Sequence, residues 1–447
     1  MQKPLIALLI SSALLTFNAQ AADLVQVYQQ ALANDATFAG ARASLAAGRE
    51  RTTQGRAGLL PVIGLSGQHT RNNGDFTPWN EGEFDVGDGG LGFVTRSNRD
   101  NSNNIYTLSI SQPLFRWANW QQYQQAKLSQ AYAETQYAQS QEDLITRVAQ
   151  AYFDVLTAED NLSSTQAQKS ATTEQLASAK RNFEVGTQTI TDTHEAQAAY
   201  DLVVAQEFAA INDLEVRRTA LLQIIGELPS RLAPLRPGVT IAAPQPATIE
   251  PWVSSAEQQN YGVIGAQLNL EIAKREIERS RSGHYPTVDL VAGSTRNSTT
   301  ANGVTRNNSI GVNWNVPLFN GFAVTSKVRE SIALEDKARN DLEATRRAAA
   351  QNARQAYLGM NSGLAQVRAL EAAEVSSKSA LDSNKLGYQV GVRINIDVLN
   401  AQRQLYSTQR DLSRARYDTL MNGLRLKAAA GTLKPEDLQP INDLLVK

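Results

Sequence analysis

Two segments of the chain alternate between apolar and small polar side chains. Their apolar positions are, in chain order, Tyr106, Leu108, Ile110, Ile310, Val312, Trp314 and Val316. A period of two, with one apolar and one polar face, predicts a half-buried β-strand. Each segment follows another strand-like stretch that begins at a proline. The pattern therefore predicts four strands, at about residues 61–72, 103–113, 286–297 and 307–317.

Alternation alone fits an ordinary soluble sheet with one wet face equally well. Two further features favour a membrane sheet. The strands that start at Pro61 and Pro286 have about the 9–11 residues that a tilted membrane strand needs. In addition, aromatic side chains follow two of the strands, and aromatic side chains at strand ends suit a membrane–water interface. The aromatic residues that follow the second and fourth strands are Phe115, Trp117, Trp120, Phe319 and Phe322. Because open sheet edges are not tolerated in lipid, four such strands require several copies of the chain to share one barrel.

Long helices are predicted by the two proline-free stretches, residues 114–228 and 318–434. A single helix over residues 117–185 would be roughly 100 Å long at about 1.5 Å per residue. Both stretches show the heptad order of coiled coils. In the first, Leu144, Val148, Ala151, Val155, Ala158 and Leu162 step by four and three; in the second, Val398, Leu405, Leu412, Thr419 and Leu426 repeat every seven residues.

Each proline-free stretch also contains a turn signal near its middle. Gly186 and Gly391 fit the end of a helix, and Asp192, with Glu195 three residues later, is expected to cap the next helix. Each stretch therefore predicts an antiparallel helical hairpin.

The two halves of the chain repeat each other. Ala151-Tyr152 recurs as Ala356-Tyr357, and Val185-Gly186 recurs as Val390-Gly391, in both cases 205 residues later. A constant offset of this kind indicates a duplicated architecture. Residues 229–251 hold six of the fourteen prolines and predict an extended linker. The expected organisation is a signal peptide at 1–21, a first repeat at 22–228, the linker at 229–251, a second repeat at 252–434 and a tail at 435–447.

The N-terminus has the pattern of a secretory signal peptide. A basic residue, Lys3, precedes an apolar run over residues 4–17, and Ala19-Gln20-Ala21 fits a cleavage site. The rest of the chain has no apolar run of about 18 residues, so no membrane-spanning helix is expected. The chain contains no cysteine, which excludes disulfides and thiolate metal sites, and its net charge of −1 argues against a nucleic-acid surface.

Several motifs of this sequence resemble the TolC family of outer-membrane efflux and secretion proteins. They are Asp23-Leu24-x-x-Val27-Tyr28-Gln29-Gln30-Ala31, Pro317-Leu318-Phe319-Asn320-Gly321, Gly387-Tyr388-x-Val390-Gly391-x-Arg393, Asp397-Val398-Leu399 and Ala430-Gly431-Thr432-Leu433. The resemblance implies a mostly α-helical homotrimer with membrane β-structure, in which three copies of four strands form one twelve-stranded barrel. A coiled-coil helical tunnel continues this barrel into the periplasm. It also implies contact with outer-membrane lipid, a periplasmic adaptor protein and an inner-membrane RND or ABC-type transporter.

The resemblance further implies a lock at the periplasmic entrance, formed between neighbouring hairpin tips. Thr191 and Asp192 match one side of this lock, and Tyr388 and Arg393 match the other. The same resemblance implies a ring of carboxylates that narrows the entrance, to which Asp397 corresponds. A second acidic ring of the family is replaced here by Asn400, which puts strict cation selectivity in doubt.

Other chemistry is weakly supported. Residues 87–92 fit the dinucleotide pattern G-x-G-x-x-G, but they lie in an acidic loop at residues 81–92 without a βαβ unit. His69, His194 and His284 are scattered, so neither a metal site nor a catalytic set is predicted. The sequence thus predicts a cofactor-free export channel of a Gram-negative outer membrane rather than an enzyme. The alternative is a soluble periplasmic coiled-coil adaptor or scaffold protein.

Overall fold

The computed structural model describes residues 21–76, 82–85, 91–94, 97–300 and 303–446. Residues 1–20 of the expected signal peptide and residues 86–90 of the acidic loop lie outside this range. The chain divides into two units. The helical unit comprises Met1–Leu45, Thr135–Gly265 and Glu343–Lys447, and the sheet unit comprises Ala46–Glu134 and Ala266–Leu342.

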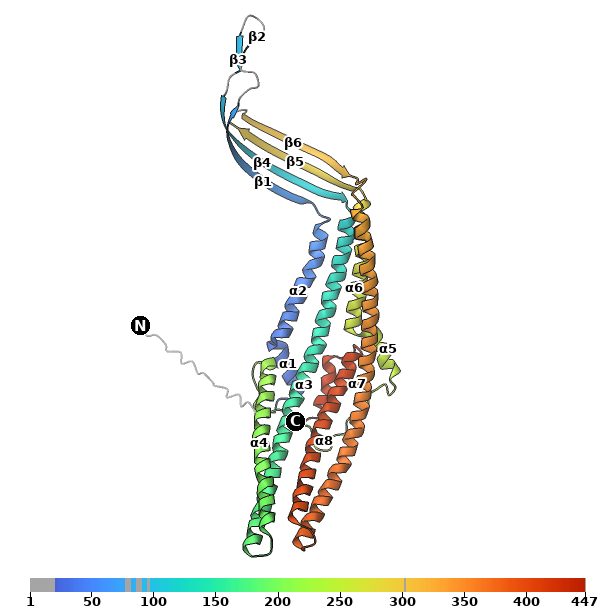
Figure 1. Cartoon of the computed structure of the whole chain (residues 1–447). Coiled ribbons are helices and arrows are strands. Elements are labelled where there is room, and N and C mark those ends of the chain that lie inside the picture. The colour runs from blue at the N-terminus through green and yellow to red at the C-terminus, as the bar shows by residue number, and fades with distance from the viewer. Residues whose placement is uncertain (1–20, 77–81, 86–90, 95–96, 301–302, 447) are drawn as a thin grey trace, which may run out of the picture. The chain divides into compact units, whose positions relative to one another are not determined.

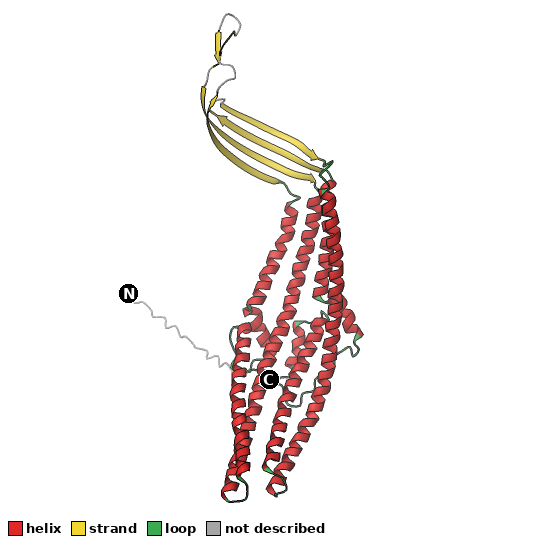
Figure 2. Cartoon of the chain, viewed as in Figure 1, coloured by secondary structure: helices red, strands yellow, loops and turns green. Residues whose placement is uncertain are grey.

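Most of the chain is helical (Figures 1 and 2). The α-helices are α1 (Leu24–Asn34), α2 (Ala36–Ala57), α3 (Trp117–Glu184), α4 (Ile190–Ile225), α5 (Glu250–Gln259), α6 (Tyr261–Arg281), α7 (Ala323–Gln389), α8 (Asn395–Ala429) and α9 (Gln439–Asn442). Two short 3₁₀ helices are η1 (Ser282–His284) and η2 (Pro435–Leu438). None of the helices in the described ranges is both long and apolar enough to cross a membrane.

The sheet unit is built on four antiparallel strands in the order β1-β4-β5-β6 (Figure 1). They are β1 (Val62–Phe76), β4 (Ser97–Phe115), β5 (Thr287–Thr299) and β6 (Gly303–Asn315). All four therefore differ by a few residues from the predicted bounds. A separate pair, β2 (Gly82–Asp85) and β3 (Leu91–Val94), was not predicted, because the loop that contains it lacks an alternating pattern.

The register of the sheet separates the side chains into two chemically distinct faces. Directly opposed residues lie on the same face. One such row contains Ile63, Ile110, Ala292 and Ile310, whereas the neighbouring row on the opposite face contains Gly64, Ser109, Gly293 and Ser309. The apolar face is exposed in a single chain: Leu65 and Ile310 have 78% and 77% of their surface accessible. The sheet needs a partner for this face.

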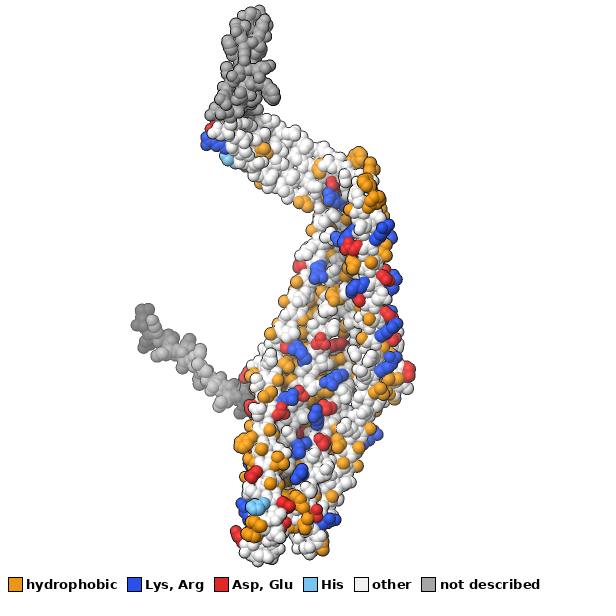
Figure 3. All heavy atoms as spheres, viewed as in Figure 1, with side chains coloured by type: hydrophobic (Ala, Val, Ile, Leu, Met, Phe, Trp, Pro, Cys, Tyr) orange, Lys and Arg blue, Asp and Glu red, His pale blue; other side chains and the backbone are white. Residues whose placement is uncertain are grey.

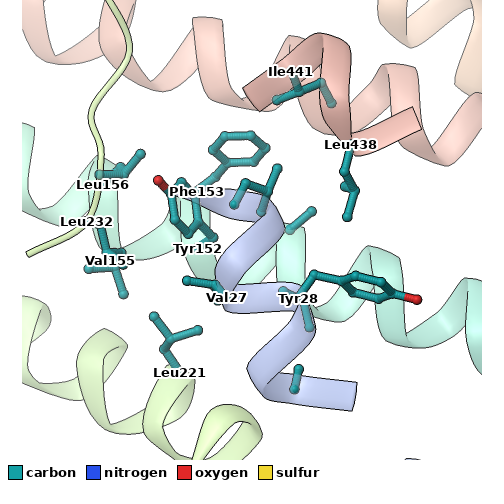
Figure 4. Packing of buried hydrophobic residues seen from close by; sticks show 14 of the residues in the cluster. Val27, Tyr28, Tyr152, Phe153, Val155, Leu156, Leu221, Leu232, Leu438 and Ile441 are labelled. Atoms are coloured by element: carbon teal, nitrogen blue, oxygen red, sulfur yellow. The ribbon is translucent and has the colours of Figure 1, made fainter. Parts of the chain in front are cut away.

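The core of the helical unit surrounds the short helix α1 (Figure 4). Asp23 caps α1 in a reciprocal capping box with Gln26, which fixes where the helix begins. Val27 and Tyr28 then pack with residues of α3, including Tyr152 and Phe153. Residues from α4, the linker and the C-terminal segment complete the cluster; they include Leu221, Leu232, Leu438 and Ile441.

The predicted coiled-coil seams are confirmed by burial. Leu144, Val148 and Val155 of α3 are 0–1% exposed, and Val398 and Leu426 of α8 are both 1% exposed. Apolar side chains at this spacing lie on one stripe of a helix. Each long helix therefore buries one stripe.

Part of the proline-rich linker is buried against the helices. Leu232 and Ala233 are only 4% and 1% exposed, and Leu232 forms a β-bridge with Ala22. At the other end of the linker, Pro251 lies in the first turn of α5, where a proline is tolerated. The linker therefore packs as part of the helical unit.

Candidate functional site

The first hairpin tip joins α3 to α4. Gly186 adopts a φ of +77°, a left-handed conformation that favours glycine, just after α3 ends. The helix cap that follows differs from the prediction, because Thr189 rather than Asp192 is the N-cap residue of α4. Asp192 occupies the third helical position, and its carboxylate accepts hydrogen bonds from the Thr189 backbone N–H (3.1 Å) and hydroxyl (2.8 Å). The Asp192 carboxylate thus closes a capping box.

The second tip joins α7 to α8 and has a different cap. Gly391 has a φ of +81°, and Ile394 is the N-cap residue of α8, with no side-chain oxygen to offer. Asp397 occupies the position that Asp192 has in the first repeat. Without a hydroxyl partner, its carboxylate instead lies 3.6 Å from the guanidinium of Arg393.

The two tips are linked inside one chain by polar side chains. Gln188, in the first tip, donates a hydrogen bond from its side-chain amide to the hydroxyl of Tyr388 in the second. Asn395 is fully buried and donates to the carbonyl of Asp192 at 3.1 Å. Its own amide oxygen accepts from Gln175 of α3 at 2.6 Å. Buried amides with both groups paired hold a defined geometry.

The sequence-predicted lock residues are only partly brought together. Tyr388 contacts the first tip through Gln188, but the side chains of Asp192 and Arg393 each find a partner within their own tip. The hydroxyl of Thr191 is exposed and, among the described residues, has no hydrogen-bond partner. The predicted pairing of Thr191 and Asp192 with Arg393 therefore does not occur within a single chain.

The sequence pattern did not indicate Gln188, Asn395 or Gln175 as site residues. One signal was present, because the 205-residue offset aligns Gln188 with Arg393 and so marks a polar side chain at the same place in both tips. Asn395 had no comparable signal, since the same offset aligns it with the apolar Ile190.

Further polar links join α3 to α8 above the tips. Arg410 donates to the amide oxygen of Gln168 at 3.1 Å, and Tyr417 donates to the carboxylate of Asp160 at 3.1 Å. Apolar contacts also join the two hairpins: the Tyr417 ring stacks on that of Phe153, and Leu399 lies in one buried cluster with Leu176.

The predicted ring position lies on the accessible side of α8. Asp397 retains 34% of its side-chain surface, and Asn400, one turn further along the helix, is exposed. Residues three apart lie on the same helix face. Both side chains are therefore accessible from the same side of α8.

The predicted interface aromatics surround the end of the sheet at which β4 is followed by α3. Phe319 and Phe322 are 76% and 71% exposed, and their rings meet edge to face with centroids 5.5 Å apart. Phe115 and Trp120 are each 43% exposed, whereas Trp117 is partly buried. Exposed aromatic side chains at one end of an apolar strand face suit the headgroup level of a bilayer.

Within the described ranges, no three His, Cys, Asp or Glu side chains gather in a way that could hold a metal ion. The three histidines, at positions 69, 194 and 284, are far apart in the sequence. His69 lies in β1, where its ring nitrogen Nδ1 is 2.7 Å from the amide oxygen of Asn104. His194 is an exposed residue of α4 near the first tip.

Comparison with known proteins agrees with this architecture. A family model described as outer membrane efflux protein matches residues 27–227 and 252–432. The chain is 35% identical to outer membrane protein TolC of Vibrio cholerae over 449 residues, which covers 98% of both proteins. It is also 32% identical to the proteases secretion protein PrtF of Dickeya chrysanthemi, over 95% of this chain and 91% of that protein.

Solved structures give the same result for the fold. The outer membrane protein VceC of Vibrio cholerae superimposes with a TM-score of 0.75 at 19% identity, covering 91% of this chain and 96% of VceC. The CmeC outer membrane channel of Campylobacter jejuni gives a TM-score of 0.78 at 17% identity, covering 94% and 89%. These likenesses confirm the predicted fold class.

Proposed function

This chain belongs to the outer membrane efflux protein family and is a channel of the outer membrane, and we propose that it acts as a passive, gated exit duct in a homotrimer. Its partners would be a periplasmic adaptor and an inner-membrane transporter of the RND or ABC type, which would supply the energy. The family is described as efflux proteins, and one relative is named for the secretion of proteases, which supports small-molecule drugs and proteins as candidate cargo.

The observation that carries the proposal is the four-stranded sheet with its exposed apolar face. Within the described residues, β1 and β6 each have only one neighbouring strand, so each leaves one edge unpaired. A bilayer tolerates neither open edges nor an incomplete barrel. Pairing of β6 with β1 of the next copy closes the barrel, and three copies provide twelve strands, more than the eight that leave little room inside.

The gate would lie at the hairpin tips. Tyr388, held by Gln188, links the tips within a chain, while Thr191, Asp192 and Arg393 remain near the accessible surface for contacts with a neighbouring copy. At exposed sites such polar contacts contribute about 0–1 kcal/mol each. They would close the entrance only as a symmetric set, and an adaptor could break them.

Adaptor docking is supported by apolar side chains at the tips. Val185 of the first tip and Val390 and Val392 of the second are 72%, 64% and 76% exposed. Apolar residues gathered at a loop tip that the chain itself does not cover are typical of a protein–protein contact. Removal of these side chains would be expected to weaken adaptor binding without affecting trimer formation.

Membrane fractionation together with planar-bilayer recording tests the proposed duct. We expect the mature protein in the outer-membrane fraction, a trimer in mild detergent, and single channels of low conductance in the closed state. A soluble monomeric protein, or a trimer that never conducts, would contradict the proposal. A monomer in the periplasmic fraction would instead favour the adaptor or scaffold alternative.

A further inference from the structure

One row of the sheet places two arginines side by side on the apolar face. Arg296 of β5 is directly opposite Arg306 of β6, and its other neighbour is Tyr106 of β4. Gly67 of β1 completes the row. The row of Ile110 and Ile310 lies four residues further along each strand, and an even separation places both rows on the same face of the sheet.

Among the residues that the structure describes, neither arginine has a partner that neutralises its charge. Both side chains are exposed, and no carboxylate of the described residues forms an ion pair with either. Like charges on directly opposed residues destabilise a sheet, because their Cβ atoms are only about 4.5–5.5 Å apart. An anion held between the two guanidinium groups would remove this repulsion.

Arg71 provides an internal comparison. It lies on the same face of β1, two rows further from the helices, and it does have a partner. Its Nη2 and Nε atoms contact the two carboxylate oxygens of Asp100 at 2.6 and 3.1 Å. Within the described part of the sheet, Arg71 is therefore paired with a carboxylate, whereas Arg296 and Arg306 are not.

The position of the row identifies the kind of anion. Eight residues separate Trp314 from Arg306, which is about 27 Å along a strand and about 20 Å of height at a typical barrel tilt. Outer-membrane barrels have an apolar band of about 25 Å between two interfacial girdles. If the aromatic residues near Phe319 and Trp120 mark the periplasmic interface, the row of Tyr106, Arg296 and Arg306 lies at the outer one.

Figure 3 shows a basic patch at this end of the sheet, with an acidic side chain and a histidine beside it, while hydrophobic side chains cover the opposite end near the start of α7. The outer interface of such a membrane contains lipid headgroups, and guanidinium groups bind phosphate through two parallel hydrogen bonds. Tyr106 beside Arg296 adds an amphipathic ring of the kind found at headgroup level.

We propose that Arg296 and Arg306 form a binding site for the phosphate groups of an outer-leaflet glycolipid. Three copies of the chain would carry three such sites around the barrel. The inference rests on the outer-membrane location, but it does not depend on the gate, the adaptor or the exported cargo.

Lipid binding to the purified detergent-solubilised oligomer tests this proposal. The probes are diphosphoryl lipid A, the same lipid with its phosphates removed, and inorganic phosphate, each measured by native mass spectrometry. We expect the phosphorylated lipid to bind at least tenfold more tightly than the dephosphorylated one. The double variant Arg296→Gln/Arg306→Gln should lose most of this difference, because it removes both charged donors of the site.

Arg71→Gln is the matched control, since it removes one arginine of the same face whose charge Asp100 already neutralises. It should leave the preference for phosphorylated lipid unchanged. Equal binding of both lipids to the unaltered protein, or an unchanged preference in the double variant, would overturn the proposal. So would inorganic phosphate that binds as tightly as the lipid. If the double variant does not assemble, the variant Arg296→Lys/Arg306→Lys takes its place. It keeps both charges but lacks the planar guanidinium groups, so it should reduce the preference for phosphorylated lipid only in part.

Discussion

Gln188 donates a side-chain hydrogen bond to the hydroxyl of Tyr388, and the two residues come from hairpin tips that are 200 residues apart in the chain. The tips of the two repeats are therefore fastened to each other before any second copy is present. A neutral amide–hydroxyl bond at a partly buried site contributes about 0.5–1.5 kcal/mol. Such a contact is strong enough to bias the position of a tip and weak enough to be broken by a partner.

The first prediction concerns this contact. Tyr388→Phe combined with Arg393→Ser should raise the single-channel conductance of the trimer in planar bilayers. Losses of about 1 kcal/mol in each of three copies would shift the equilibrium between closed and open states roughly a hundredfold, at about 1.4 kcal/mol per factor of ten. Gln188→Leu should reproduce the effect of Tyr388→Phe, and the two together should do no more than either alone.

Gln389→Ala is a control for the gate variants, because Gln389 is the exposed neighbour of Tyr388 and, within the described chain, forms no side-chain hydrogen bond. Its conductance should match that of the unaltered protein. Unchanged conductance in the Tyr388→Phe/Arg393→Ser variant would remove both residues from the lock.

A second prediction concerns the charge at the entrance. Asp397→Asn should weaken the block of the channel by a trivalent cation, because the variant removes one carboxylate from each copy. The reciprocal change, Asn400→Asp, adds a carboxylate one helical turn away and should strengthen the block. Titration of the current with hexaamminecobalt measures both effects. If neither variant alters the blocking concentration, Asp397 does not face the entrance.

The different partners of Asp192 and Asp397 show how far the sequence could predict the site. The repeat places both carboxylates at equivalent positions, which the 205-residue offset made visible. Their roles differ because the preceding cap residue is Thr189 in one tip and Ile394 in the other. The N-cap is the residue that adopts the extended backbone just before the helix. Spacing alone predicted Asp192, three residues after the actual N-cap, Thr189.

The fold was easier to predict than the contacts between hairpins. Seams such as Leu144 and Val148 follow from a helical period, and the sheet faces follow from alternation, so both are local in sequence. The pairing of Gln175 and Asp192 with Asn395 joins segments more than 200 residues apart, and nothing in the periodicity indicates which polar residues meet.

A third prediction uses Tyr152 and Tyr357, which the repeat also aligns. The Tyr152 hydroxyl is fully buried and donates to the carbonyl of Ala233 at 2.8 Å, near the start of the linker. Tyr357 donates to the carbonyl of Ala247, near its end. Tyr152→Phe leaves a buried carbonyl without this partner and should cost about 1–3 kcal/mol. Tyr357→Phe should cost less, because water can reach its site.

Thermal unfolding of the two variants in the same detergent measures this difference, and limited proteolysis reports on the linker. We expect the lower melting temperature and the faster cleavage between residues 233 and 247 in Tyr152→Phe. Equal melting temperatures would mean that the linker is not anchored by the buried hydroxyl.

The last prediction concerns Glu142, a carboxyl group of α3 that is only 7% exposed. Burial raises the pKa of Glu142 to about 8, although the Leu433 backbone N–H donates to it and opposes the shift, and the adjacent Asp143 adds to it. The other carboxyl oxygen, Oε1, is buried and without a partner within the described structure. The folded protein therefore holds a proton on Glu142 that the unfolded chain releases near its ordinary pKa.

Because the folded state binds this proton more tightly, the protein should lose stability as the pH rises from about 4.5 to about 8. Glu142→Gln keeps the shape of the side chain but cannot ionise, so it should flatten this slope. The variant should melt higher than the unaltered protein at pH 8 and at nearly the same temperature at pH 5. Glu436→Gln, at an exposed glutamate of the C-terminal segment, should leave the slope in place. If the melting temperatures of the Glu142→Gln variant and of the unaltered protein change with pH in parallel across this range, Glu142 is already ionised in the folded state.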